Sequence, residues 1–159
     1  MQTPRWSEVA DFFGRTNGQP LGVYVFGAGV KDWEKAIAAV VSQGWQVGFT
    51  SIGRPDLPGV REIFAGADDL SASLSVQPLV GLFMTTRFST ADEIEFGLHS
   101  DDVRGQTGLD AVCTFLRVVA QAVGKPAVLT SEELRPRHLL AYDPGTDHFA
   151  VRPETPRTG

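Results

Sequence analysis

The sequence predicts a single-domain α+β protein, with a mainly antiparallel or mixed sheet of about six strands and two to four helices packed mostly on one face. Three observations favour this class. Segments with the two-residue period of strands outnumber those with the helical period. Several neighbouring strand segments are joined by connections too short for a parallel crossover. Glycine accounts for 17 of the 159 residues, which favours many turns and short elements over a helical bundle.

The first part of the chain predicts helices and strands in alternation. A helix is expected after Ser7, a suitable N-cap, because apolar residues follow it at helical spacing. Residues 21–26 form an apolar run typical of a buried strand. A second helix is expected from a cap at Asp32 to about Gln43. In residues 45–50 apolar and polar side chains alternate, which predicts a strand with one face buried.

The middle of the chain predicts a three-stranded antiparallel meander after a short helix near residues 60–65. In residues 71–76 apolar side chains alternate with serines. The Gln77–Pro78 pair is expected to break this strand, and residues 79–88 are expected to form a second, long apolar strand. Residues 94–98 alternate again and complete the meander.

The last part of the chain predicts the longest helix and a final hairpin. Residues 107–123 carry a single thin polar stripe, so this helix is expected to pack centrally, and Gly124 is placed to end it. A short strand is expected over residues 127–130. Residues 139–142 and 148–151 flank a strong turn signal and predict a hairpin.

Domain organisation and location follow from the same features. Residues 1–152 contain no linker and are expected to form one domain, whereas residues 153–159 contain no hydrophobic residue type and are expected to form a mobile tail. No apolar run approaches the roughly 20 residues of a membrane span. The N-terminus lacks the pattern of a secretory signal, and the lone Cys113 forms no internal disulfide. These features favour a cytoplasmic protein.

The net charge of −5 is concentrated in one segment of the chain. Residues 67–110 contain eight acidic residues and two arginines, whereas the segments on either side are close to neutral. Because the chain lacks a basic stripe, nucleic-acid binding is not expected. A localised acidic surface favours a basic protein partner. The alternative is an ordinary solvated face.

Nucleotide binding has weak support in the sequence. Gly27–Ala28–Gly29 follows an apolar strand and resembles the start of a dinucleotide fingerprint. Asp32 occupies the position of the third glycine, where a carboxylate would repel a pyrophosphate at a helix N-terminus. A simple strand-to-helix turn is the preferred interpretation, and no cofactor is expected.

No catalytic or metal-binding set is evident. Cys113 lies on the apolar side of a helix, which predicts a buried structural thiol and not a nucleophile. The histidines, His99, His138 and His148, lack the spacing of a zinc site, and the acidic residues lack the cadence of a calcium loop. His99 ends an acidic strand just before Asp101 and Asp102, so a histidine–carboxylate contact is possible there.

The sequence therefore favours a non-catalytic cytoplasmic protein-binding module with an acidic face. An immunity-type protein that neutralises a basic toxin or enzyme belongs to this class. The expected partner-binding residues are acidic side chains of the central segment, with the first four favoured: Glu93, Glu95, Asp101, Asp102, Asp92, Asp68 and Asp69.

Two alternatives remain from other functional classes. One is a small-molecule-binding protein or hydrolytic enzyme, with a pocket around His99 and nearby carboxylates. The other is a structural subunit of a homo-oligomer, for example a homodimer joined through the long apolar helix or through an open sheet edge.

Overall fold

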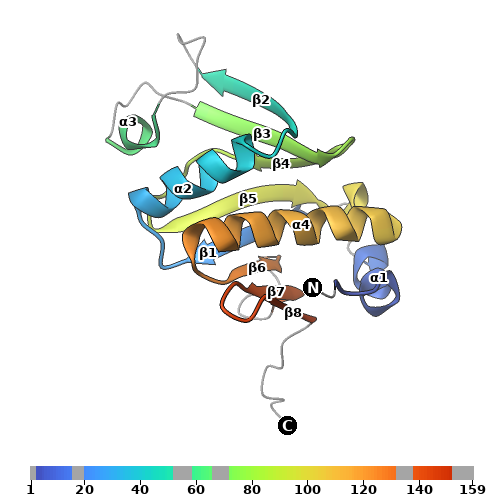
Figure 1. The fold of residues 1–159 in the computed structure, drawn as a ribbon. Helices are drawn as coiled ribbons and strands as arrows, with labels where there is room; N and C mark the ends of the chain where they lie inside the picture. The colour runs from blue at the N-terminus through green and yellow to red at the C-terminus, as the bar shows by residue number, and fades with distance from the viewer. Residues whose placement is uncertain (1–2, 16–19, 52–58, 66–71, 132–137, 152–159) are drawn as a thin grey trace.

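The computed structural model describes residues 3–15, 20–51, 59–65, 72–131 and 138–151 (Figure 1). The expected tail and two of the expected site residues, Asp68 and Asp69, lie outside these ranges. Within them, helices and an antiparallel sheet confirm the predicted α+β class.

The described residues form four α-helices, a short 3₁₀ helix and eight strands. The helices are α1 (Trp6–Arg15), α2 (Val30–Val41), α3 (Val60–Phe64), η1 (Ser100–Asp102) and α4 (Gly105–Val123). The strands are β1 (Pro20–Phe26), β2 (Gln46–Ser51), β3 (Ala72–Leu79), β4 (Leu82–Thr86), β5 (Glu93–His99), β6 (Ala127–Thr130), β7 (Leu140–Asp143) and β8 (His148–Val151).

All strands belong to one antiparallel sheet, in the order β2-β3-β4-β5-β1-β6-β7-β8. The expectation of about six strands is therefore wrong, because the sheet has eight. The hairpin of β7 and β8 adds to the sheet beside β6, and β2 extends the opposite end by pairing with β3. Each addition pairs backbone groups that a smaller sheet would leave at its edge.

The β3–β4 hairpin lies at different residues from those expected. Pro78 does not break the strand, since β3 continues to Leu79, and the pairing shifts register between Val76 and Leu79. Such an irregularity tolerates a residue that has no N–H to donate. The chain turns instead at Gly81, whose φ of 91° favours glycine. The prediction of one strand over residues 79–88 is therefore wrong, because β3 ends at Leu79 and β4 begins at Leu82.

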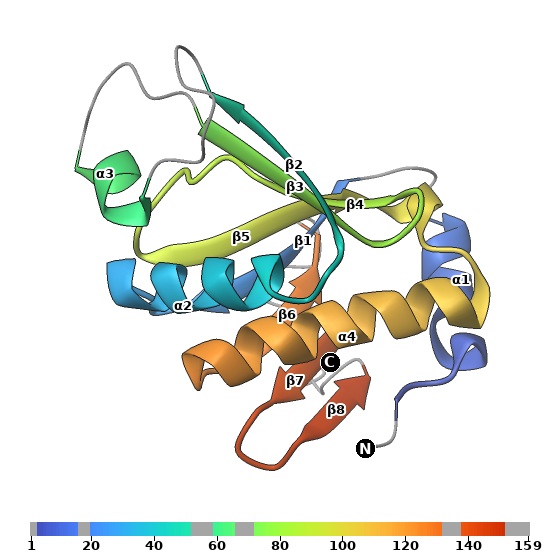
Figure 2. The same ribbon diagram turned by 45° about the horizontal axis from the view of Figure 1, so that its top comes forward.

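The fold has a helical layer on one face of the sheet. Helices α2 and α4 lie side by side there, and α1 lies against the N-terminal end of α4 (Figures 1 and 2). The thin polar stripe expected for α4 is confirmed, because its buried residues include Val112, Phe115 and Leu116. Gly124 ends the helix in the left-handed conformation, as expected.

The other face of the central strands carries no described helix (Figure 2). On β5 the side chains of Ile94, Phe96 and Leu98 enter the core, so Glu95 and His99 project from this opposite face. We call it the helix-free face and define it by the outward residues of β4, β5 and the start of β1. Among the described residues of this face, Phe83, Glu95 and His99 are exposed.

Candidate functional site

A row of small residues crosses the helix-free face. Strand register aligns one residue from each of six neighbouring strands, in the order Gly48, Ser75, Thr85, Gly97, Gly22 and Thr130. None of these side chains extends far from the backbone, and the accessible part of the row, from Gly48 to Gly97, forms a low floor. The Tyr24 ring covers Gly22, where an added Cβ would lie 2.5 Å from it, and Thr130 is buried.

The floor deepens into a hollow of about 680 Å³ over β4 and β5. Its lining combines apolar, polar and charged side chains: Pro20, Phe83, Thr85, Arg87, Ser89, Glu95, Gly97, Leu98, His99 and Asp102. Gly97 is the centre of the floor. A Cβ added there would meet only the carbonyl oxygens of Thr85 and Leu21, at 3.8 and 3.9 Å. Position 97 therefore leaves open space at the centre of the hollow.

The two walls of the hollow differ in chemistry. Since Thr85 pairs with Gly97, the antiparallel register places Phe83 near His99 and Arg87 near Glu95. Phe83 is 47% exposed, which is a large fraction for a phenylalanine ring in a strand. One wall is thus largely aromatic and the other is ionic.

The ionisable side chains of the hollow are not paired with one another. Among the described residues, Arg87, Glu95, His99 and Asp102 make no side-chain hydrogen bond or ion pair. Elsewhere the charged side chains of Lys125, Arg117 and Arg61 each contact a carboxylate. The charged side chains around the hollow thus differ from these paired ones within the part of the chain that the structure describes.

The predicted acidic residues follow β5 along its length. Glu95 and Asp102 line the hollow, and Glu93 lies on the same outward face as Glu95. Asp101 is exposed in η1, next to Asp102. Asp92 precedes the opposite end of the strand, where its carbonyl accepts the Ala28 N–H at 2.9 Å. The structure thus brings two of the expected residues to one cavity, together with an arginine that the sequence analysis did not assign to it.

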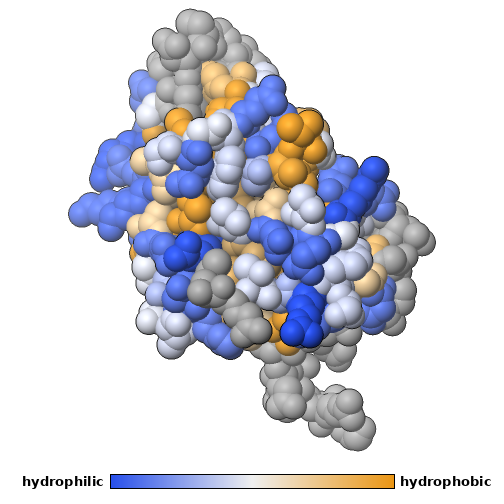
Figure 3. Space-filling model, turned by 45° about the vertical axis from the view of Figure 1, so that its right-hand side comes forward, coloured by the Kyte–Doolittle hydropathy of each residue, from blue (hydrophilic) through white to orange (hydrophobic). Residues whose placement is uncertain are grey.

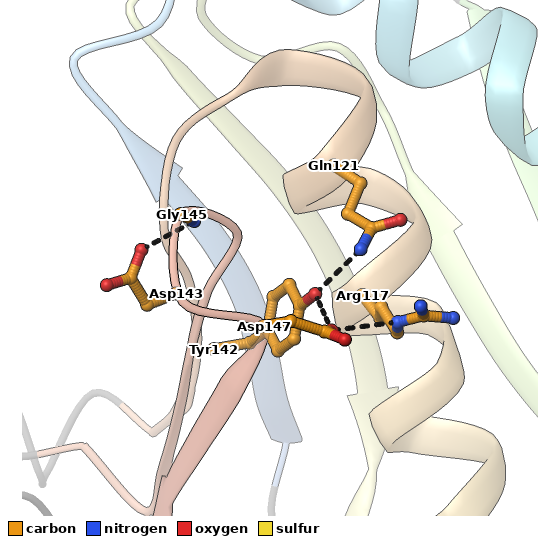
Figure 4. Close-up of polar contacts among 6 residues, drawn as sticks. All are labelled: Arg117, Gln121, Tyr142, Asp143, Gly145 and Asp147. Atoms are coloured by element: carbon orange, nitrogen blue, oxygen red, sulfur yellow. Dashed lines mark hydrogen bonds and ion pairs between the residues drawn. The ribbon is translucent and has the colours of Figure 1, made fainter. Parts of the chain in front are cut away.

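A second polar cluster, missed in the sequence, joins α4 to the β7–β8 hairpin (Figure 4). The Tyr142 hydroxyl donates to Asp147, and Gln121 Nε2 donates to the Tyr142 oxygen at 2.9 Å. Arg117 Nε contacts Asp147 Oδ1 at 3.1 Å. These residues come from distant parts of the chain, so no local spacing signals the cluster.

The charges of this cluster stabilise one another. Hydrogen bonds from Tyr142 and Arg117 lower the pKa of Asp147, whereas the carboxylate raises the pKa of Arg117. Burial and the bond to Asp147 raise the pKa of the Tyr142 hydroxyl. Each polar group is used inside the cluster, and none of its residues lines the hollow. We therefore assign it a structural role, as a clamp that fixes the hairpin to the central helix.

The Gly27–Gly29 turn is closed by the chain itself. Helix α2 begins at Val30 with Gly29 as its N-cap, so Asp32 is not the cap residue expected from the sequence. Asp32 Oδ2 accepts the Gly29 N–H at 3.1 Å and contacts Lys125 Nζ at 2.8 Å. Lys125 Nζ also donates to the Gly27 carbonyl at 2.6 Å. A carboxylate–lysine pair thus occupies the helix N-terminus that a pyrophosphate would require.

Cys113 is a buried structural thiol, as expected. It has no exposed surface, and burial raises its pKa to about 12. Because the thiol stays protonated at neutral pH, it cannot act as a thiolate nucleophile. The described residues include no cluster of three histidine, cysteine or acidic side chains placed to hold a metal. No described helix is long and apolar enough to cross a membrane.

No protein family, curated protein or solved structure matches this chain. The interpretation of the hollow therefore depends on its own geometry and chemistry.

Proposed function

We propose that the protein is a non-catalytic binding module that receives a basic segment of another protein in the hollow of the helix-free face. One observation carries this proposal. Charged side chains without partners in the described structure surround a hollow that also exposes the Phe83 ring. A neutralising partner of a basic toxin or enzyme, the immunity type, is one protein of this class.

The charges favour a cationic ligand. Glu95 and Asp102 outweigh Arg87, and Glu93 adds a further negative charge on the same strand face. A lysine or arginine of the partner forms charge-assisted hydrogen bonds with such carboxylates. Asp92 and Asp101, exposed beyond the two ends of β5, extend the attraction beyond the hollow and speed encounter.

Charge alone does not supply the affinity. An exposed ion pair contributes only about 0.2–1 kcal/mol, because water and salt screen it. Burying an apolar side chain contributes about 25 cal/mol per Å² removed from water. We therefore expect the partner segment to place an apolar residue against Phe83 and a basic residue near Glu95 or Asp102.

A second candidate function uses the same hollow. Small-molecule binding or hydrolysis around His99 gains support because His99 and two carboxylates, Glu95 and Asp102, line one cavity. General-base catalysis needs a histidine within hydrogen-bond reach of its reacting proton, and an orienting carboxylate strengthens that base. Since His99 makes no such bond among the described residues, binding remains the preferred proposal.

The test compares two glycine variants on the same floor row. Gly97→Val adds a side chain at the centre of the hollow floor, whereas Gly48→Val adds the same side chain outside the hollow, where a Cβ meets only the Ser75 carbonyl at 3.9 Å. Each immobilised protein is exposed to an extract of its source cell, and the captured proteins are cross-linked and identified by mass spectrometry.

The proposal predicts a captured protein that wild type and Gly48→Val retain and that Gly97→Val loses. Its cross-linked segment should contain lysine or arginine. Capture that is equal in all three proteins, or no specific capture by wild type, contradicts the proposal. Capture of an acidic segment contradicts the assigned charge complementarity.

A further inference from the structure

The open edge of β2 has the properties of a pairing surface. Strand β2 lies at the end of the sheet and pairs only with β3 in the part of the chain that the structure describes. An edge strand presents unpaired N–H and C=O groups that another strand can satisfy. We propose that β2 pairs with β2 of a second copy of this chain, which forms a two-fold dimer with one continuous antiparallel sheet.

The edge lacks the features that prevent such pairing. Natural edge strands commonly carry lysine, other charges or proline, which make the approach of another strand unfavourable. Residues 46–51 contain none of these, and residues 36–53 contain no charged residue at all. The uncharged stretch covers the end of α2, the connection and the whole of β2.

Exposed apolar side chains accompany this edge. Val47 of β2 is 39% exposed and Val41, at the end of α2, is 45% exposed. Val80, at the tip of the β3–β4 hairpin, is 88% exposed. These strands form the upper part of the molecule in Figure 1, and Figure 3 shows hydrophobic side chains on the upper part of the face that it presents. Pairing at the edge would remove the valines beside β2 from water.

The charge of the chain indicates that the partner at the β2 edge is a second copy. Two chains with a net charge of −5 repel each other over most of their surfaces, so self-association needs a neutral patch. The β2 edge carries no charged residue. A basic partner would find no carboxylate on β2. The edge therefore suits the chain itself and not the basic segment proposed for the hollow.

Two-fold symmetry also matches the layers of the fold. A two-fold axis perpendicular to the sheet makes the paired β2 strands antiparallel, as all strands of this sheet are. It also places both helical layers on the same face. Val47 pairs with Val76, a core residue, and so lies on that helical face. The exposed valines of the two copies then meet across the axis.

The mass of the full chain in solution tests this inference. Sedimentation and light scattering are measured over about a hundredfold range of protein concentration. Val47→Glu places a charge at the proposed interface, and Ala150→Glu places the same charge on β8, the opposite edge strand. Circular dichroism checks that each variant is folded. Val41→Glu is a second interface variant, which lies outside the strand and is used if Val47→Glu is unfolded. Deuterium exchange of the β2 amides locates the contact.

The inference predicts a dimer for wild type and Ala150→Glu, with β2 amides protected. Val47→Glu and Val41→Glu should weaken the dimer by about tenfold or more and release that protection. A wild-type monomer at every concentration, an assembly larger than a dimer, or folded interface variants that associate as tightly as wild type would overturn it. So would dissociation caused by Ala150→Glu alone. Loss of binding at the hollow leaves each of these results unchanged.

Discussion

Single side chains decide the local chemistry of this protein, and the Asp147 clamp is the best example. Asp147 has a φ of 51°, a backbone conformation that its contacts with Tyr142 and Arg117 help to hold. The turn itself was predictable from Asp143 to Asp147, but its attachment to α4 was not. The contact joins a helix and a hairpin that are far apart in the sequence. The spacing of apolar and polar residues along the chain predicts single elements, but not which distant elements contact each other.

Removing the Tyr142 hydroxyl tests the clamp. Tyr142→Phe keeps the buried ring and loses the hydrogen bonds to Asp147 and Gln121. We expect the free energy of unfolding to fall by about 1 kcal/mol, the usual contribution of one such bond. Chemical denaturation measures the change. An unchanged midpoint would show that the clamp does not contribute to stability.

The clamp also predicts a pH dependence. The pKa of Asp147 is lowered in the folded state, so its ionised form stabilises the protein above its unfolded pKa of about 4. That stabilisation disappears as the pH falls through the lower, folded pKa. Asp147→Asn should therefore be less stable than wild type at neutral pH, and the difference should shrink below about pH 4. A difference that is constant with pH would exclude the ionic contribution.

Cys113 provides a second residue-scale prediction. Because its thiol is buried and its pKa is raised to about 12, a thiol reagent at pH 8 should label the native protein only as fast as the chain unfolds. Denatured protein should react at once. Rapid labelling of the native protein would contradict the burial of α4 against the sheet.

At the scale of elements, the sequence predicted the helices and strands that have regularly spaced apolar residues better than it predicted the turns. The end of α4 at Val123 and the final hairpin lie where side-chain period and turn residues placed them. The β3–β4 turn was misplaced because Pro78 is a stronger local signal than Gly81. Pairing with β2 and β4 carries β3 past the proline, and Gln77 Oε1 accepts the Gly81 N–H at 3.0 Å. Tertiary pairing outweighed the local preference.

The Gly81 turn gives a prediction at this scale. Gly81→Ala forces a side chain into a left-handed conformation and should cost roughly 1–2 kcal/mol of unfolding free energy. The matched control is Gly97→Ala, which lies in a strand with ordinary contact distances around its Cβ. Thermal unfolding measures both variants. Equal stability of the two variants would place the turn elsewhere.

At the scale of the whole molecule, strand order produces the site. Strand β1 lies between β5 and β6, so Gly22 pairs with Gly97, and the Tyr24 ring covers Gly22. The sequence predicted the fold class and the outward face of β5, where Glu93 and Glu95 lie. The predicted meander places β4 beside β5, which brings Arg87 close to Glu95. The sequence could not predict that β1 flanks the other side of β5, because short connections fix only local pairs.

Charge reversal on β5 tests the electrostatic contribution of this surface. Glu93→Lys with Glu95→Lys should slow association with a basic partner and weaken its dependence on salt. The single variant Glu95→Lys should change stability little, since Glu95 is exposed and makes no ion pair in the described structure. Stopped-flow binding at several salt concentrations, beside thermal unfolding, separates the two effects. A large loss of stability would assign these glutamates a structural role.

Binding in the hollow is tested by an NMR titration of the ¹⁵N-labelled full chain with a synthetic peptide that alternates lysine and leucine. We expect shifts in the amides around Thr85, Gly97 and His99 that weaken with added salt and vanish in Gly97→Val but persist in Gly48→Val. Absence of shifts at these amides, or identical shifts in both glycine variants, would contradict a ligand site in the hollow.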